Sequence, residues 1–220
     1  MKGRLKMKPK KKEKEFYYGK EEGIFKEIFL KEQNKDLLSS VIEASIKKNC
    51  GKINPYHIKR EEFHKWMENI SSGMLLQTDI GIIEIRVNLD DTKKTREKSL
   101  ILFLDNWDLI EQRRKITADY QYIQLNFNWG MIGDEKDFRD ITLGTEDNIC
   151  MNENAFVRKM NLEKFIGYWR EKNVEKIDEY KYIIMLGLDW EELEELYSYT
   201  KDALIKKYME ELKILSENKK

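Results

Sequence analysis

The feature that most constrains the fold is a pair of short segments in which apolar and polar residues alternate on either side of a tight turn. The segments are MLLQT at 74–78 and IIEIRVN at 82–88. A period of two places successive side chains on opposite faces of a β-strand. Residues 78–81 have the length of a hairpin loop. The sequence therefore predicts a β-hairpin in this part of the chain.

The same alternation predicts which residues of the hairpin face one another. With a turn at 78–81, the expected cross-strand pairs are Gln77–Ile82, Leu75–Glu84 and Gly73–Arg86. A period of two also places Glu84, Arg86 and Asn88 on one face of the second strand. The only carboxylate on that face therefore has a leucine opposite it.

Segments with helical and strand-like periodicity surround the hairpin. Apolar residues three and four apart predict helices at 21–30, 34–49, about 94–112, 162–170, 177–186, 191–197 and 203–215. Further strands are predicted at 122–129 and around 155–160, with a weaker candidate at 56–66 and an acidic loop at 130–147. This order predicts an α/β fold in which a mixed sheet is flanked by helices.

The length of the chain suits one domain with extensions at its ends. At 220 residues it lies within the size that a single mixed α/β core can hold. We expect a flexible basic arm at 1–20, a core at 21–160, and a helical C-terminal extension at 161–220 that packs on the core. Basic and acidic residues number 41 each. A nucleic-acid interaction would therefore have to rest on local clusters of charge.

The clearest local cluster of charge is the N-terminal segment MKGRLKMKPKKKEKEF. A segment of this composition cannot bury itself, so it predicts a flexible arm. One interpretation is that its lysines contact nucleic-acid phosphates and release counterions. The candidate contacts are Lys8, Lys10, Lys11 and Lys12. The other interpretation, a solvated tail of a lysine-rich chain, stays open.

Cysteine and histidine are scarce. Cys50 and Cys150 have no cysteine or histidine at ligand spacing, and no signal peptide or long uncharged apolar run is visible. We expect two free thiols, a cytoplasmic location and no contact with a membrane. His57 and His64 stand alone, so a structural zinc site, which needs four ligands, is not predicted.

Several segments, taken in order, resemble landmarks of a known family. They are FKEIF, NKDLL, LLQTDIGIIEIRVN, YIQLNFNWG and YKYIIMLGLDWEELEELYSYTKDALIKKYMEELK. Together they span residues 21–216 and resemble the PD-(D/E)XK nuclease family transposases, also called recombination-promoting nucleases. The resemblance implies a restriction-endonuclease-like core, an origin in mobile elements and cleavage of DNA with Mg²⁺.

Cleavage of this kind needs an Asp and a Glu on the paired strands of one hairpin, where both bind a hard cation. The resemblance places the first acid at Gly73 and the second at Arg86. It places the residue that positions water at Asn88, and an often acidic position near the first helix at Glu22. A guanidinium stays protonated, so Arg86 puts a fixed positive charge where the cation would bind. We therefore expect no bound metal or other cofactor, and a catalytically impaired pseudo-nuclease.

A protein of this kind would act by binding. The expected partners are DNA, RNA or a nucleic-acid-processing protein complex, and an expected role is inhibition of a host nuclease or defence complex. Arg86 has two interpretations at this point. It faces solvent beside Glu84 on an ordinary strand, or it binds a phosphate in the former catalytic cleft.

The alternative is a working Mg²⁺-dependent DNA endonuclease of the transposase type whose acidic residues have moved. Its candidate catalytic residues are Glu22, Asp79, Glu84 and Asn88, with Asp90 as a further carboxylate. Asp79 lies at the hairpin tip, roughly 7 Å along the strand from Glu84 at ~3.3 Å per residue. One Mg²⁺ with bonds of about 2.1 Å would reach both only with difficulty. The two hypotheses differ in whether two carboxylates converge.

Overall fold

A computed structural model describes the greater part of the folded chain. The described residues are 22–55, 74–88, 100–101, 103–104, 106–108, 110–111, 116–129, 136–142 and 154–218. Several predicted features lie outside them: the arm at 1–20, the weak strand candidate at 56–66, Gly73, Asp90 and Cys150. Among the residues described, no helix combines the length and apolar character that crossing a membrane requires.

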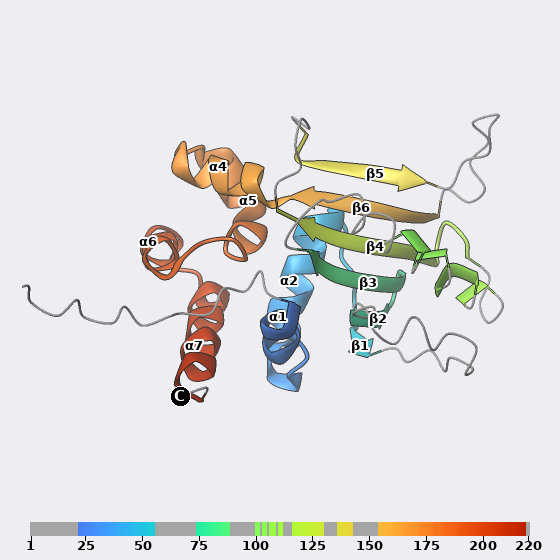
Figure 1. Ribbon diagram of the computed structural model, residues 1–220, viewed down its shortest axis with the longest axis horizontal. Coiled ribbons are helices and arrows are strands. Elements are labelled where there is room, and N and C mark those ends of the chain that lie inside the picture. Colours follow the sequence, from blue (N-terminus) through green and yellow to red (C-terminus); the bar gives the residue numbers. More distant parts are fainter. Residues whose placement is uncertain are drawn as a thin grey trace, which may run out of the picture.

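A six-stranded mixed sheet forms the centre of the molecule (Figure 1). Its strands are β1 (Asn54–Pro55), β2 (Met74–Thr78), β3 (Gly81–Asn88), β4 (Gln121–Asn128), β5 (Phe138–Thr142) and β6 (Ala155–Asn161). The strand order is β1-β2-β3-β4-β6-β5. Strands β3, β4 and β6 are parallel, whereas β2 and β5 pair antiparallel with β3 and β6. The predicted α/β class with a mixed sheet is confirmed.

Helices occupy both ends of the described chain. They are α1 (Glu22–Phe29), the 3-10 helix η1 (Glu32–Asn34), α2 (Lys35–Ile46), α4 (Leu162–Arg170), α5 (Val174–Ile184), α6 (Trp190–Thr200) and α7 (Ala203–Asn218). The described residues within 100–111 are also helical. In Figure 1, α4 to α7 gather beyond one end of the sheet. The predicted helices are present among the described residues, α4 with the predicted ends and the others with shifted ends. The predicted loop at 130–147 is corrected, because it contains β5.

The register of the hairpin agrees with the prediction. Leu75 lies opposite Glu84, and Gln77 lies opposite Ile82. The described pairing ends at Met74 and Ile85. The register follows from the turn length and from burial, since a slip of one residue would move every side chain to the other face of the sheet.

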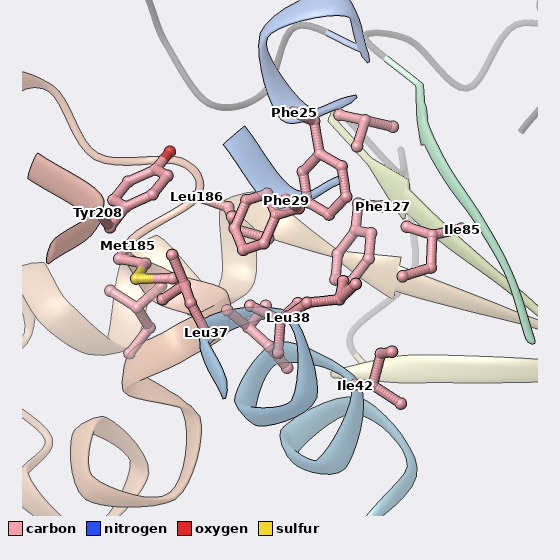
Figure 2. Close-up of a cluster of buried hydrophobic side chains, with 14 of the residues drawn as sticks. Phe25, Phe29, Leu37, Leu38, Ile42, Ile85, Phe127, Met185, Leu186 and Tyr208 are labelled. Atoms are coloured by element: carbon pink, nitrogen blue, oxygen red, sulfur yellow. The ribbon is translucent and has the colours of Figure 1, made fainter. Parts of the chain in front are cut away.

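The main hydrophobic core lies on the face of the sheet that carries Ile83, Ile85 and Val87. Figure 2 shows Phe25 and Phe29 of α1 lying between Phe127 of β4 and Tyr208 of α7. The rings of Phe25 and Phe29 stack with centroids 4.2 Å apart. Leu37 and Leu38 of α2 and Met185 and Leu186 after α5 complete this cluster (Figure 2). One continuous core therefore joins the C-terminal helices to the sheet.

A second, smaller core covers part of the opposite face of the sheet. Its members are Ile82, Phe103, Ile110, Ile116, Tyr122, Ala155 and Val157. Phe103 belongs to the helical segment within 100–111, and its ring stacks on Tyr122 at a centroid distance of 4.9 Å. The parallel strands are thus covered on both faces, which is the usual condition for parallel sheets.

Gly81, the first residue of β3, should not tolerate a side chain. Its φ is +140°, and an added Cβ would lie 1.9 Å from the carbonyl oxygen of Gln121. We expect Gly81→Ala to lower the free energy of unfolding by about 1–3 kcal/mol, because the strained backbone conformation and the contact with β4 both oppose it. Urea denaturation measures the change.

Gly167→Ala is the matched control. Gly167 lies inside α4, and an added Cβ would meet nothing within 4 Å. Alanine favours the helix over glycine by up to about 1 kcal/mol, so this variant should be as stable as the parent or slightly more stable. Equal effects of the two substitutions would contradict the close approach of β3 and β4 at Gly81.

Candidate functional site

Polar side chains gather where the three parallel strands end. On the face opposite the main core, the rows across β3, β4 and β6 run from Ile82–Tyr122–Ala155 through Glu84–Gln124–Val157 and Arg86–Asn126–Lys159 to Asn88–Asn128–Asn161. Toward the carboxyl ends of the strands the rows change from apolar to polar, with two cations in the third row and three amides in the last. In open α/β sheets this edge is where ligands bind.

We define the polar cluster by its side chains: Glu84, Arg86, Gln124, Asn126, Asn128, Lys159 and Asn161. All seven are buried, with Glu84 only 1 % and Arg86 only 5 % exposed. The interpretation of Glu84 and Arg86 as residues of a solvent-facing strand is therefore wrong. The reason is that β3, β4 and β6 are interior strands of a sheet whose two faces are both covered.

Glu84 is the hydrogen-bond acceptor at the base of the polar cluster. Its Oε2 accepts from the hydroxyl of Tyr122 at 2.7 Å, and from the side-chain amides of Asn106 and Gln124 at 3.0 Å each. Asn106 comes from the helical segment within 100–111, whereas Tyr122 and Gln124 lie on β4. Three donors on one buried carboxylate oxygen join the helical segment to the sheet.

The Mg²⁺ implied by the family resemblance does not fit these residues. A hard cation needs several carboxylate oxygens, but Glu84 is a single carboxylate, and its Oε2 already accepts three hydrogen bonds. Its cross-strand neighbour is Leu75, and Arg86 follows it on the same face. Within the part of the chain that the structure describes, no three His, Cys, Asp or Glu side chains gather as a metal site would require.

The other candidate carboxylates do not join Glu84 within the described residues. Asp79 is exposed at the hairpin turn, and its Oδ2 accepts a hydrogen bond from the backbone N–H of Lys52 at 3.1 Å. Its role is therefore to fasten the loop before β1 to the turn. Glu22 begins α1 and Asn88 ends β3 in register with Asn128. The side chains of Glu22 and Asn88 lie outside the described residues.

Two cations flank an amide in the row before the last one at the strand ends. Arg86 and Lys159 lie on either side of Asn126, two strand spacings apart, which is about 10 Å. Guanidinium, ammonium and amide N–H groups are all hydrogen-bond donors. Such a set favours an anion with several oxygens, above all a phosphate, over a metal cation.

Sequence reasoning singled out Arg86 in this row but assigned no role to the others. It predicted a strand at 122–129 without a role for Gln124, Asn126 and Asn128, and it did not single out Lys159. A usable signal was present, because Asn is a poor strand former and the strand contains two of them. Three amides at alternating positions of one strand indicate side chains that are hydrogen-bonded inside the protein. Asn161 combines two roles, since its side chain also caps α4 by accepting from the N–H of Lys164 at 3.3 Å.

Tyr122 gives the polar cluster a measurable dependence on pH. Burial, reinforced by the nearby Glu84 carboxylate, raises the pKa of Tyr122 well above its usual value. The unfolded chain loses this phenolic proton near pH 10, whereas the folded chain keeps it. The contribution of Tyr122 to stability is therefore complete below about pH 10 and falls by about 1.4 kcal/mol per pH unit above it.

The Tyr122→Phe variant tests this expectation. The variant should lose stability at neutral pH, because the hydroxyl donates to Glu84. Its stability should then fall less steeply than that of the parent above about pH 10, because one ionisable group has been removed. Urea denaturation across this pH range measures both slopes. Identical slopes would contradict a protected Tyr122.

The described site is thus a buried cluster of amides, two cations and one carboxylate that accepts three hydrogen bonds, on the carboxyl-terminal halves of three parallel strands. Comparisons with protein-family models, with curated proteins and with solved structures find no match to this chain.

Proposed function

We propose that this chain is a catalytically inactive PD-(D/E)XK nuclease-like protein that binds nucleic acid through its phosphates. The order of its elements supports the proposal: an antiparallel hairpin, a helical segment, and a strand that returns parallel to the second strand of the hairpin. This is the arrangement that the proposed restriction-endonuclease-like core needs to bring a hairpin and a parallel strand into one site.

One observation carries the proposal. Arg86 stands where the resemblance places the second catalytic acid, and Glu84, the carboxylate before it on the same face of β3, lies opposite Leu75. The site has therefore exchanged the ligands of a cation for the donors that bind an anion. A nuclease scaffold that keeps phosphate contacts and loses its metal would still occupy nucleic acid without cutting it.

Binding without cleavage suggests how such a protein would work. A bound chain shields the nucleic acid from other enzymes, and a chain of mobile-element origin would benefit when those enzymes belong to the host. Inhibition of a host nuclease or defence complex is the role that follows from this proposal. The lysines of residues 1–20 would add phosphate contacts of the non-specific kind.

Equilibrium binding without divalent ions tests the proposal. Fluorescence anisotropy with labelled single-stranded DNA, duplex DNA and single-stranded RNA in excess EDTA should show binding that weakens steeply as salt rises. Arg86→Gln should weaken binding by about 10- to 100-fold, the equivalent of one charge-assisted hydrogen bond. Lys206→Gln, an exposed change on α7, is the matched control and should leave the affinity unchanged.

Two results of the same titrations would count against the proposal. Absence of binding to all three nucleic acids at low salt would contradict it and direct the search to a protein partner. Equal affinities of the parent and Arg86→Gln would remove the polar cluster from the interface. Circular dichroism of each variant establishes that a weaker affinity does not come from unfolding.

A further inference from the structure

The C-terminal helices carry a groove that is lined by apolar and acidic side chains. This groove of about 570 Å³ opens between α6 and the turn from α4 to α5. Its floor is formed by Trp169 and Ile177, and the apolar side chains of Val174 and Tyr199 stand 55 % and 48 % exposed along it. Exposed apolar side chains gathered in a groove are typical of a surface that binds another segment.

The rim of the groove is acidic. Glu191, Glu194 and Glu195 of α6 line it, and all three are exposed. Residues 189–200 contain five acidic residues and no basic one. Among the residues that the structure describes, Glu191 forms no ion pair. The groove therefore combines an aromatic floor with an excess of negative charge on one side.

One ammonium group of the chain already lies in the groove, and its contacts show which kind of ligand the groove favours. The Nζ of Lys172 lies 4.1 Å from the centroid of the Trp169 ring and 3.9 Å from Oε2 of Glu195. An ammonium between an indole face and a carboxylate gains a cation–π contact together with an ion pair. Further lysines along the groove would meet Tyr199 and the remaining carboxylates in the same way. A lysine-rich peptide is the ligand that suits this surface.

The chain itself contains such a peptide. Residues 2–14 carry eight basic residues and one acidic residue, and they precede α1. The twenty-one residues before α1 can extend by up to about 70 Å at ~3.3 Å per residue. A domain of this length has a diameter of only about 45 Å. The arm is therefore long enough to reach the groove.

We propose that residues 2–14 dock in the groove between α6 and the α4–α5 turn of the same chain. Charge complementarity supplies the attraction, and the aromatic floor accommodates the aliphatic stems of the lysines. If the proposed function also holds, nucleic acid competes with α6 for the arm, so that the arm is released when phosphates are bound. The docking itself does not depend on nucleic-acid binding.

Zero-length cross-linking of the full-length protein tests the docking. A carbodiimide joins a lysine amine to a carboxylate only when the two are in contact. Mass spectrometry at low salt should find residues 2–14 cross-linked to Glu191, Glu194 and Glu195. The Glu191→Gln/Glu194→Gln/Glu195→Gln variant should lose most of all arm cross-links, because a docked arm reacts mainly with these three carboxylates, whereas an undocked arm would react equally with other exposed acids.

Two controls test whether the cross-links are specific to the groove and whether they form within one chain. Glu210→Gln/Glu217→Gln removes exposed acids from α7, outside the groove, and should leave the arm cross-links unchanged. Mixing chains labelled with ¹⁴N and ¹⁵N distinguishes contacts within one chain from contacts between two. Arm cross-links spread evenly over exposed acids, or none to α6, would overturn the proposal. Cross-links of mixed isotope would also overturn it, by assigning the groove to the arm of a second copy.

Discussion

Replacing Glu84 with alanine is expected to lower the free energy of unfolding by about 3–5 kcal/mol, which is the cost of breaking a buried charged network. The substitution leaves the hydroxyl of Tyr122 and the side-chain amides of Asn106 and Gln124 buried without their acceptor. Each unsatisfied donor costs about 1–3 kcal/mol, partly offset by local rearrangement. Urea or guanidinium denaturation of the purified variant gives the value.

Two further variants separate the hydrogen bonds from other effects. Glu84→Gln keeps one side-chain oxygen as an acceptor, so its loss of stability should be smaller than that of Glu84→Ala. Glu191→Ala removes an exposed carboxylate and should change stability by no more than about 0.5 kcal/mol. A loss below about 1 kcal/mol in Glu84→Ala would contradict the network, because one net hydrogen bond alone contributes that much.

The second large effect concerns binding. Arg86→Gln/Lys159→Gln is expected to weaken nucleic-acid binding by about 100-fold or more, since two charge-assisted contacts of about 1.5–3 kcal/mol each are lost. The slope of log affinity against log salt for duplex DNA should become shallower by about 1.8, at 0.9 for each lost phosphate contact. Anisotropy titrations at several salt concentrations measure both quantities.

The matched control is Lys206→Gln/Lys213→Gln, which removes two exposed cations of α7 and the same total charge. If only the net charge of the protein mattered, the two double variants would weaken binding equally and shift the salt slope equally. That result would contradict a phosphate site in the polar cluster. A change in affinity without a change in slope would show that the two cations support the site without contacting phosphates.

The hairpin shows how much of the fold the sequence determines. The turn at 78–81 and the period of two were enough to predict that Leu75 faces Glu84, and the structure confirms that pair. Burial explains the success, because one face of β3 contributes to the main core and only one register places Ile83 and Ile85 there. The helix predicted at 162–170 agrees with α4 for the same reason, as its apolar stripe faces that core.

Tertiary contacts explain what the sequence did not reveal. Strand β5 lies at the edge of the sheet and contains Arg139 and Asp140, so its five residues lack the apolar alternation that predicts a strand. The polar cluster was missed because an alternation of polar and apolar residues is the same whether the polar face meets solvent or a covering segment. Only the pairing of β3, β4 and β6 showed that Arg86 and Lys159 share a row.

The most direct test of the pseudo-nuclease proposal measures cleavage and binding in the same samples. The natural protein is incubated with single-stranded and duplex DNA in Mg²⁺, Mn²⁺ or EDTA, and both the bound fraction and the cleaved fraction are quantified. We predict binding in all three buffers, no cleavage in any of them, and no rise in Tm on adding the divalent ions. Cleavage that requires a divalent ion and disappears in the Glu84→Gln variant would contradict the proposal and show that the catalytic acids had moved along the hairpin.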